Sequence, residues 1–198
     1  MNFLAHIYLS GNNPEIQIGN FIGDYVKGKK YENYPDLIQK GILLHRKIDD
    51  FTDRHPKVKK SSELLKENYG RYAGVIVDLY YDHFLAANWE QFSNQTLRDF
   101  VTRIHILFLK NYFRLPGEVK SFLPFMIQSR RLENYKSFNG LEKALTIMTN
   151  YTSIPPFVSY AMSQLDKHYD EFHNDFFSFF EEVRQMALSE INGHAFKL

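Results

Sequence analysis

Three short stretches of the chain combine histidine and aspartate at spacings that suit the binding of a metal ion. In residues 41–53, His45, Asp49 and Asp53 follow one another at intervals of four. At about 100° per residue, an interval of four keeps side chains along one slowly drifting face of a helix. The simpler alternative is a surface helix whose acids pair with the basic side chains of the same stretch, Arg46, Lys47 and Arg54.

A second stretch, residues 77–85, repeats the pattern in an apolar setting. Asp78 and Asp82 are again four apart, and His83 follows directly, with valine, leucine, tyrosine and phenylalanine around them. A buried carboxylate is costly unless it is paired or bound to a metal. The pattern therefore favours a metal site, and the alternative is a set of buried acids held by Arg or Tyr donors.

Residues 19–28 and 1–6 add one candidate each. Asp24 lies in an apolar stretch flanked by glycines, which allow close approach of a backbone or ligand but can equally mark tight helix packing. His6 lies at the end of the first six residues. Together the candidates form a mixed nitrogen and oxygen set of three histidines and four aspartates: His6, Asp24, His45, Asp49, Asp78, Asp82 and His83.

This ligand set indicates a particular kind of chemistry. Mixed imidazole and carboxylate ligands suit Mn²⁺, Mg²⁺ or Fe²⁺, and the absence of cysteine leaves only His, Asp and Glu as ligands. Such an ion polarises a phosphoryl oxygen and lowers the pKa of a bound water, so we expect hydrolysis of a phosphoester. Arg46, beside His45, can meet the charge of a phosphate with a bidentate fork.

The elements that must position these residues are predicted to be helices. Apolar residues recur mostly at helical spacing, strand-like alternation is scarce, and Gly and Pro breaks delimit about eight or nine helices. The fold class is therefore all-α. Residues 156–191 are predicted to form one long helix, and the phenylalanine run within 176–180 puts apolar side chains on more than one side of it. We expect that helix to pack against two neighbours.

Composition bounds the class of protein. The 198 residues, 44% hydrophobic and 24% charged, fit one globular domain spanning 1–198. A net charge of +1 excludes strong attraction of the whole molecule to nucleic acid or anionic lipid, and the chain has no Walker-type glycine loop. No uncharged run approaches membrane-spanning length and the first residues make a poor signal peptide, so we expect a cytoplasmic protein.

The remaining histidines are interpreted as structural. His168 and His173 lie among acidic residues, but five residues apart on a helix they point in different directions, and the others are taken as structural by default. These remaining histidines are His55, His105, His168, His173 and His194.

Four stretches in this order resemble the bacterial acyl carrier protein phosphodiesterase family, also called holo-acyl-carrier-protein hydrolase. They are MNFLAH, GNFIGDYVKG, LHRKIDDFTD and YDHFL, at residues 1–6, 19–28, 44–53 and 81–85. The resemblance is best over roughly residues 1–90. It implies an all-helical fold of a distorted HD-domain type and a metal-dependent phosphodiesterase, with Mn²⁺ or a similar ion, that removes 4′-phosphopantetheine from the serine of holo acyl carrier protein to give the apo form.

The resemblance also implies site residues, with one departure from the usual HD pattern. The adjacent His-Asp pair is missing, since Arg46 follows His45 and the nearest pairing is the reversed Asp82-His83. Matched residue by residue, the family places Asp24, His45, Asp49, Asp82 and His83 at or near the metal, with His6 and Asp78 as further ligands or supporting groups. Asp24, His45, Arg46, Asp82 and His83 are the expected catalytic residues, and several carboxylates are candidates for the base.

A local excess of positive charge bears on the partner. Residues 25–60 hold ten basic and five acidic side chains. Acyl carrier proteins are strongly acidic, so a basic rim would steer such a substrate to the site; the alternative is an ordinary solvated lysine face. The expected partner-binding residues are Lys27, Lys29, Lys30, Arg46, Lys47 and Arg54.

Two other functions fit parts of the pattern. One is an HD-like phosphohydrolase of a nucleotide or another small phosphoester, which needs a closed pocket lined by aromatic side chains. The other is a non-catalytic helical module that binds an acidic protein, with buried ion pairs in place of metal ligands. Metal analysis separates this module from both enzymes.

Overall fold

A computed structural model describes residues 1–193, and within that range the chain is helical and contains no strand. The all-α prediction is confirmed, while the distorted HD-type arrangement stays a prediction. The elements are α1 (Phe3–Leu9), α2 (Pro14–Phe21), η1 (Gly23–Tyr25), η2 (Lys30–Asn33), α3 (Asp36–Arg54), α4 (Pro56–Glu63), α5 (Lys66–Tyr69), η3 (Gly70–Tyr72), α6 (Ala73–Ala87), η4 (Trp89–Gln91), α7 (Leu97–Lys110), η5 (Tyr112–Arg114), α8 (Gly117–Gln128), α9 (Arg131–Asn134), α10 (Phe138–Tyr151), α11 (Val158–Lys167) and α12 (Tyr169–Asn192).

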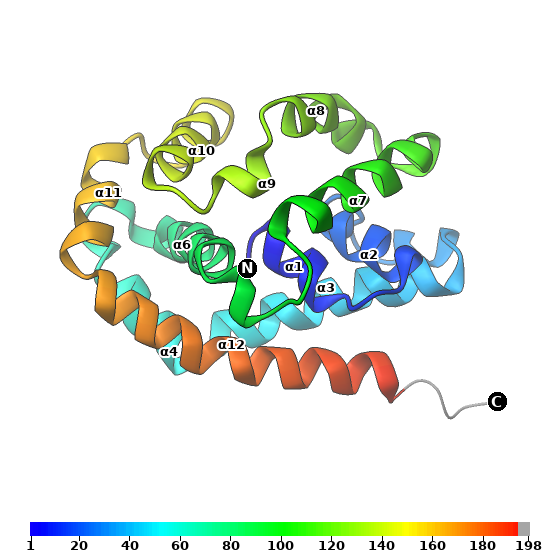
Figure 1. Cartoon of the computed structure of the whole chain (residues 1–198), viewed down its shortest axis with the longest axis horizontal. Helices are drawn as coiled ribbons and strands as arrows, with labels where there is room; N and C mark the ends of the chain where they lie inside the picture. Colours follow the sequence, from blue (N-terminus) through cyan, green and yellow to red (C-terminus); the bar gives the residue numbers. More distant parts are fainter. Residues whose placement is uncertain (194–198) are drawn as a thin grey trace.

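The helices surround a single core. The buried apolar side chains form one cluster that runs from the first residues into α12. Figure 1 shows α12 along one side of the molecule and α8, α9 and α10 along the opposite side, with α1, α3 and α6 between them. Helix α6 lies at the centre, and its side chains from Ile76 to Ala86 are nearly all buried. This arrangement agrees with the single domain expected from chain length.

Helices α2 and α3 cross at van der Waals contact of their backbones. A methyl group at Gly19 would lie 2.1 Å from the carbonyl oxygen of Ile38, and one at Gly41 would lie 2.3 Å from that of Ile16. Only glycine allows this approach, since any larger residue would force the helices apart. The contact brings the next residue of α2, Asn20, against His45, which is one turn beyond Gly41.

The C-terminal segment differs from its prediction at one residue. Two helices, α11 and α12, replace the single helix expected over residues 156–191, and the backbone breaks at His168 (φ −114°, ψ 26°). The expectation that the phenylalanine run packs against two neighbours is confirmed. Phe176 contacts Tyr81 and Phe84 of α6, while Phe177 stacks on Phe92 beyond η4.

Over residues 1–193, the longest and most apolar helices still fall short of what a membrane crossing requires.

Candidate metal centre

His6, His45 and Asp49 bring their side chains together from α1 and α3. One ligand atom from each lies within 4.8 Å of the other two. The His6 Nε2 atom is 3.1 Å from Asp49 Oδ1, and the His45 Nε2 atom is 3.1 Å from Asp49 Oδ2. The two imidazole rings stack with their centroids 4.1 Å apart. Two ring nitrogens and a carboxylate therefore converge on one point.

Asn20 holds both rings from behind. Its Oδ1 atom lies 2.8 Å from His6 Nδ1 and 3.2 Å from His45 Nδ1. A carbonyl oxygen only accepts hydrogen bonds, so with the amide in this orientation both Nδ1 atoms carry the proton and donate it. In a neutral ring the Nε2 atom is then a bare lone pair, and both such lone pairs point at the Asp49 carboxylate. Acceptors that face each other in this way call for a cation between them.

The electrostatics of the cluster agree with that requirement. Burial lowers the pKa of His45, but the nearby carboxylates of Asp24 and Asp49 outweigh it and raise the value to about 9. Burial, together with the positive charge of His45, lowers the pKa of His6 to about 4. Burial raises the pKa of Asp49, yet its contacts with both histidines dominate and hold it well below its usual range. His45 thus carries a proton where a metal ion would sit.

Asp24 reaches the same point from η1. Its Oδ1 atom is 3.4 Å from His45 Nε2, and its side chain is 62% exposed. The contact with His45 lowers the pKa of Asp24, so its carboxylate is ionised beside the cluster. The preceding Gly23 makes this possible, because a Cβ atom there would lie 2.3 Å from His45 Cγ. The glycine beside Asp24 therefore lets η1 pack directly on the imidazole ring.

The cluster opens into a cleft of about 910 Å³ between α1, α3 and α6 on one side and α8, α9 and α10 on the other. Four aspartates line it: Asp24, Asp49, Asp53 and Asp78. Asp78 Oδ1 is 3.0 Å from the Met1 nitrogen, which is 4.0 Å from Asp49 Oδ1. Asp78 therefore lies at the edge of the cluster. The opposite wall is largely apolar and aromatic, with Phe122, Phe125, Ile147, Met148 and Tyr151.

Asp82 and His83 are not brought to the cluster, although both were expected to bind the metal. Both carboxylate oxygens of Asp82 accept backbone hydrogen bonds, from Leu4 N at 2.9 Å and Ala5 N at 3.0 Å. Asp82 is buried, which raises its pKa to about 7, and it anchors the first turn of α1 and so positions His6. His83 donates through Nδ1 to the Tyr135 carbonyl at 2.8 Å. Sequence spacing alone does not separate these structural hydrogen bonds from metal ligation.

Arg46 is also used differently from the expectation. Its Nη2 atom donates to the carbonyls of Val26 and Gly28, at 2.8 and 2.7 Å, and its guanidinium lies over the Tyr31 ring. These contacts fasten α3 to the segment that follows η1. Arg46 does not line the cleft, because it projects from a different side of α3. Its predicted role as the phosphate fork is not supported by this position.

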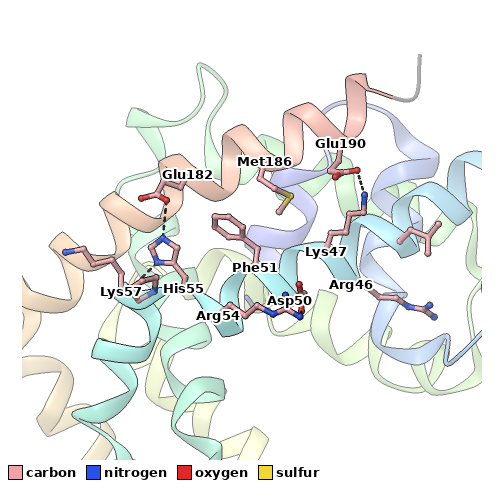
Figure 2. Close-up of a pocket in the computed structure, with 12 residues that line it drawn as sticks. Arg46, Lys47, Asp50, Phe51, Arg54, His55, Lys57, Glu182, Met186 and Glu190 are labelled. Atoms are coloured by element: carbon pink, nitrogen blue, oxygen red, sulfur yellow. Dashed lines mark hydrogen bonds and ion pairs between the residues drawn. The ribbon is translucent and has the colours of Figure 1, made fainter. Parts of the chain in front are cut away.

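The expected basic rim divides into two parts. Lys47 and Arg54 line a separate groove of about 810 Å³ between α3, α4 and α12. Figure 2 shows that their charges are matched there: Lys47 reaches Glu190 of α12, and Arg54 lies beside Asp50 at 2.6 Å. The other part comprises Lys27, Lys29 and Lys30, which follow η1 on the surface, and none of these three has an ion-pair partner within residues 1–193.

Most of the histidines interpreted as structural make structural contacts. His55 lies 3.3 Å from Glu182 across the groove and its Nδ1 atom accepts from Lys57 N, and His168 lies 3.3 Å from Glu171. The His173 ring packs edge to face against Phe84 and at a tilt against Phe177. His105 is buried in α7, and His194 lies outside the described residues.

Asn20 and Arg131 are site residues that the sequence did not single out. Asn20 follows Gly19 in the stretch 19–28, one of the four that resemble the family. The signal that could have identified it is its position one residue before the end of α2, beside the close contact of Gly19 with α3. Arg131 lines the cleft from α9, far along the chain. Its surroundings in the sequence are an ordinary polar stretch with no local signal.

The donor set fits a divalent metal ion. Within the described part of the chain the buried His45 Nε2 atom makes no hydrogen bond of acceptable geometry, although two carboxylates lie within 3.4 Å of it. A ring nitrogen held from behind by an amide oxygen and aimed at carboxylates is the arrangement that metal-binding histidines adopt. His6, His45 and Asp49 would hold the ion, and Asp24 is near enough to join them.

Fold and site together describe an all-α protein with a cluster of His and Asp side chains that could hold a metal ion at the floor of a cleft. In comparisons with known proteins, the acyl carrier protein phosphodiesterase family matches residues 1–183. The chain belongs to this family. Proteins named acyl carrier protein phosphodiesterase from Yersinia pestis, Enterobacter sp. (strain 638) and Salmonella agona (strain SL483) are each 29% identical over 188 residues, which cover 94% of this chain and 97% of theirs. No solved structure matches the chain.

Proposed function

We propose that the protein is a metal-dependent phosphodiesterase that removes 4′-phosphopantetheine from the serine of holo acyl carrier protein. The family match supports the substrate, since the relatives are named for this activity. The observation that carries the metal dependence is the pair of Nε2 atoms that Asn20 turns toward Asp49. Mn²⁺ is the ion we favour, with Mg²⁺ or Fe²⁺ as alternatives, because the donors are nitrogen and oxygen only.

The chain supplies binding and orientation around the ion. When bound, the metal ion polarises a phosphoryl oxygen and lowers the pKa of a coordinated water. Asn20 fixes the two rings in the tautomer that offers Nε2, and Asp24 keeps an ionised carboxylate at the mouth of the cluster. Asp24 is therefore the acid we favour to orient the attacking water, and it can accept a proton from it.

The shape of the cleft fits the arm that is removed. Phosphopantetheine is long and partly apolar, and the wall opposite the acids is built of aromatic and aliphatic side chains such as Phe122 and Met148. The carrier protein itself would dock outside the cleft, where Lys27, Lys29 and Lys30 provide positive charge next to η1. The cytoplasmic location expected from the sequence is part of this proposal.

Mass spectrometry of the carrier protein tests the proposal. We expect incubation of holo acyl carrier protein with the protein and Mn²⁺ to remove the phosphopantetheine arm. Asp24→Ala should lower the rate by at least about 100-fold, the scale seen when a preorganised group at a reacting centre is removed. Full activity of Asp24→Ala would remove Asp24 from the mechanism, and an inactive wild-type protein in the presence of Mn²⁺, Mg²⁺ or Fe²⁺ would overturn the function.

One observation favours a second candidate. The small-phosphoester hydrolase required an aromatic pocket, and Phe3, Tyr25, Phe122, Phe125 and Tyr151 all line the cleft. The same assay with free nucleotides and with bis-(p-nitrophenyl) phosphate in place of the carrier protein separates the two. We expect kcat/KM for holo acyl carrier protein to be far above that for either small substrate, and the reverse order would favour the second candidate.

A further inference from the structure

Arg131 is the only Lys or Arg among the described residues that line the cleft. The same cleft holds four aspartates, Asp24, Asp49, Asp53 and Asp78. A phosphodiester is an anion, so these carboxylates repel it unless positive charge compensates them. A metal ion would offset part of that repulsion. The chain itself offers two positive groups: the Met1 ammonium, which is already paired with Asp78 at 3.0 Å, and the guanidinium of Arg131 on the wall formed by α8, α9 and α10.

The guanidinium of Arg131 has donors to spare. Its Nη2 atom donates to the Ala144 carbonyl at 3.2 Å, whereas its Nε atom is buried and has no hydrogen-bond partner within residues 1–193. A guanidinium has five N–H donors in a planar fork, and a buried donor without an acceptor carries a desolvation cost. The contact with Ala144 fixes the side chain, and Arg131 also lies beside the buried Tyr135 hydroxyl, so the donors available to an anion are those that face the cleft.

The lining of the cleft agrees with a position of Arg131 across from the acids. Tyr25, next to Asp24, lines the cleft together with Arg131. Tyr25 also packs on Phe122, with ring centroids 5.6 Å apart, which joins η1 to α8. Arg131 and Asp24 therefore face a common space.

The backbone before Arg131 is held in an unusual conformation. Arg130 has φ 50° and ψ 39°, and it is the one residue other than glycine with a positive φ in the described range 1–193. Left-handed geometry is unfavourable for a residue with a side chain, and such strain gathers at ligand clamps and active sites. Here it turns the chain from α8 into α9. The Arg130 side chain pairs with Glu133, whereas Arg131 turns into the cleft.

We propose that Arg131 binds the phosphate group of the substrate, with its guanidinium donating hydrogen bonds to the non-bridging oxygens on the side away from the metal ligands. The planar fork of arginine matches phosphate in a bidentate manner, which a lysine cannot reproduce. This assignment rests on the proposed phosphodiesterase function. It gives Arg131 the role that the sequence suggested for Arg46.

Replacement of Arg131 tests the assignment. In Arg131→Gln we expect kcat/KM with holo acyl carrier protein to fall by about 100-fold or more, as for loss of one preorganised donor at a reacting centre. Arg131→Lys keeps the positive charge but loses the planar fork, so its kcat/KM should lie between those of the wild type and Arg131→Gln. The matched control is Arg130→Gln, which removes the same charge one residue away and should stay within about twofold of the wild type, because its partner Glu133 forms a surface pair.

Binding of inorganic phosphate gives a readout that does not depend on turnover. In the presence of Mn²⁺, titration calorimetry should show phosphate bound at least about tenfold more weakly by Arg131→Gln than by the wild type and Arg130→Gln. Binding of Mn²⁺ itself, measured by electron paramagnetic resonance, should be the same in all three. A structural role alone would lower the urea midpoint and weaken both ligands together, whereas the proposed role weakens phosphate selectively. If Arg131→Gln does not fold, Arg131→Lys decides by the same two titrations.

The outcomes separate this assignment from the proposed function. An active wild-type protein whose Arg131→Gln variant binds phosphate and turns over substrate normally would overturn the role of Arg131 alone. A wild-type protein that neither binds Mn²⁺ nor releases phosphopantetheine would overturn the function on which it rests. Normal Mn²⁺ binding with selective loss of phosphate binding supports both.

Discussion

The cleft and the groove lie on two sides of the same helix, α3, and both are lined by aspartate and arginine. Histidine lines the groove, and at the cleft two histidines contact Asp49. In the groove three pairs match most of the charges: Arg54 with Asp50, Lys47 with Glu190, and His55 with Glu182 (Figure 2). Arg46, which also lines the groove, donates to backbone carbonyls instead. In the cleft, four aspartates face one arginine and the Met1 ammonium, which pairs with Asp78, and two ring nitrogens point at a carboxylate. Neighbouring residues of one helix, Asp49 and Asp50, therefore belong to opposite electrostatic settings.

The difference separates residues that stabilise the protein from residues that bind a ligand. A pair of opposite charges on a surface needs no further partner and contributes little free energy. A buried nitrogen that faces carboxylates without a good hydrogen bond needs a cation to complete it. Charge that the fold leaves unmatched is therefore the better sign of function, and the size of the two cavities, about 910 and about 810 Å³, does not distinguish them.

The largest expected effect comes from replacing one of two neighbouring aspartates on α3, Asp49, and comparing it with the same replacement at Asp50. Asp49→Asn should lower both the affinity for Mn²⁺ and kcat/KM by more than about 100-fold, because loss of an outer partner alone costs 10–100-fold. Asp50→Asn removes the same charge from the Arg54 pair and should change either quantity by less than about twofold. Isothermal titration with Mn²⁺ and the phosphopantetheine release assay measure the two. Equal losses in both variants would remove the distinction between cleft and groove.

The next largest effect is a pH dependence of stability in the metal-free protein, prepared with a chelator. The pKa of His45 rises from 6.5 to about 9 on folding, so its contribution is fully present below pH 6.5 and is lost as the pH rises through 9. The loss amounts to about 3 kcal/mol at 1.36 kcal/mol per pKa unit. The pKa of His6 falls to about 4, so acidification from pH 6.5 to 4 also destabilises the fold. Among the contributions of these two groups, stability is therefore greatest near pH 6.5.

Urea unfolding with a chelator at several pH values measures this profile. His45→Asn should abolish the decline between pH 6.5 and 9, and saturating Mn²⁺ should abolish it in the wild type, since the ion replaces the proton. If the stability of the metal-free wild type does not change between pH 6.5 and 9, the carboxylates do not hold a proton on His45.

Asn20 carries a smaller and more specific effect. Asn20→Leu should weaken Mn²⁺ binding by about 10–100-fold, because the two rings lose the acceptor that fixes their tautomer. Asn20→Asp keeps an acceptor oxygen for both Nδ1–H groups and should bind Mn²⁺ within about tenfold of the wild type. If Asn20→Asp lost the metal as fully as Asn20→Leu, the amide would be acting as a donor, and the tautomers assigned to His6 and His45 would be reversed.

The smallest effect concerns the approach of the carrier protein. Changing Lys27, Lys29 and Lys30 together to Glu should raise KM for holo acyl carrier protein several-fold and leave kcat unchanged, and high salt should act on the wild type in the same way. Three exposed lysines that do not line the cleft form the matched control: Lys59, Lys110 and Lys167 changed to Glu. The same rise in KM in the control would indicate a general charge effect and no docking site beside η1.

The sequence predicted the fold class because apolar spacing at a helical period is a local property. It missed the break at His168 because the apolar residues of α11 and α12 both recur at a helical period. The break depends instead on how the two helices pack. Part of the site could also be predicted from residues close in sequence. His45 and Asp49 share a helical face, and Asp24 follows Gly23, which has no side chain and so leaves room for the His45 ring.

The rest of the site depended on contacts between distant residues. Asp82 and His83 have the same side chains as metal ligands. Only the tertiary structure shows that they make hydrogen bonds with the backbone of Leu4, Ala5 and Tyr135 instead. Arg46 was placed near a phosphate because it neighbours His45, but adjacent helical residues point about 100° apart. Arg131 enters the cleft from α9, a contact that no spacing within the first ninety residues could indicate.

The position of the metal ion is the most direct test of the account. Crystals grown with Mn²⁺ and measured near the manganese absorption edge should give an anomalous difference peak bounded by His6 Nε2, His45 Nε2 and the Asp49 carboxylate. A peak beside Asp82 and His83, or a peak in the groove next to Asp50 and Glu190 with none at the cluster, would contradict it.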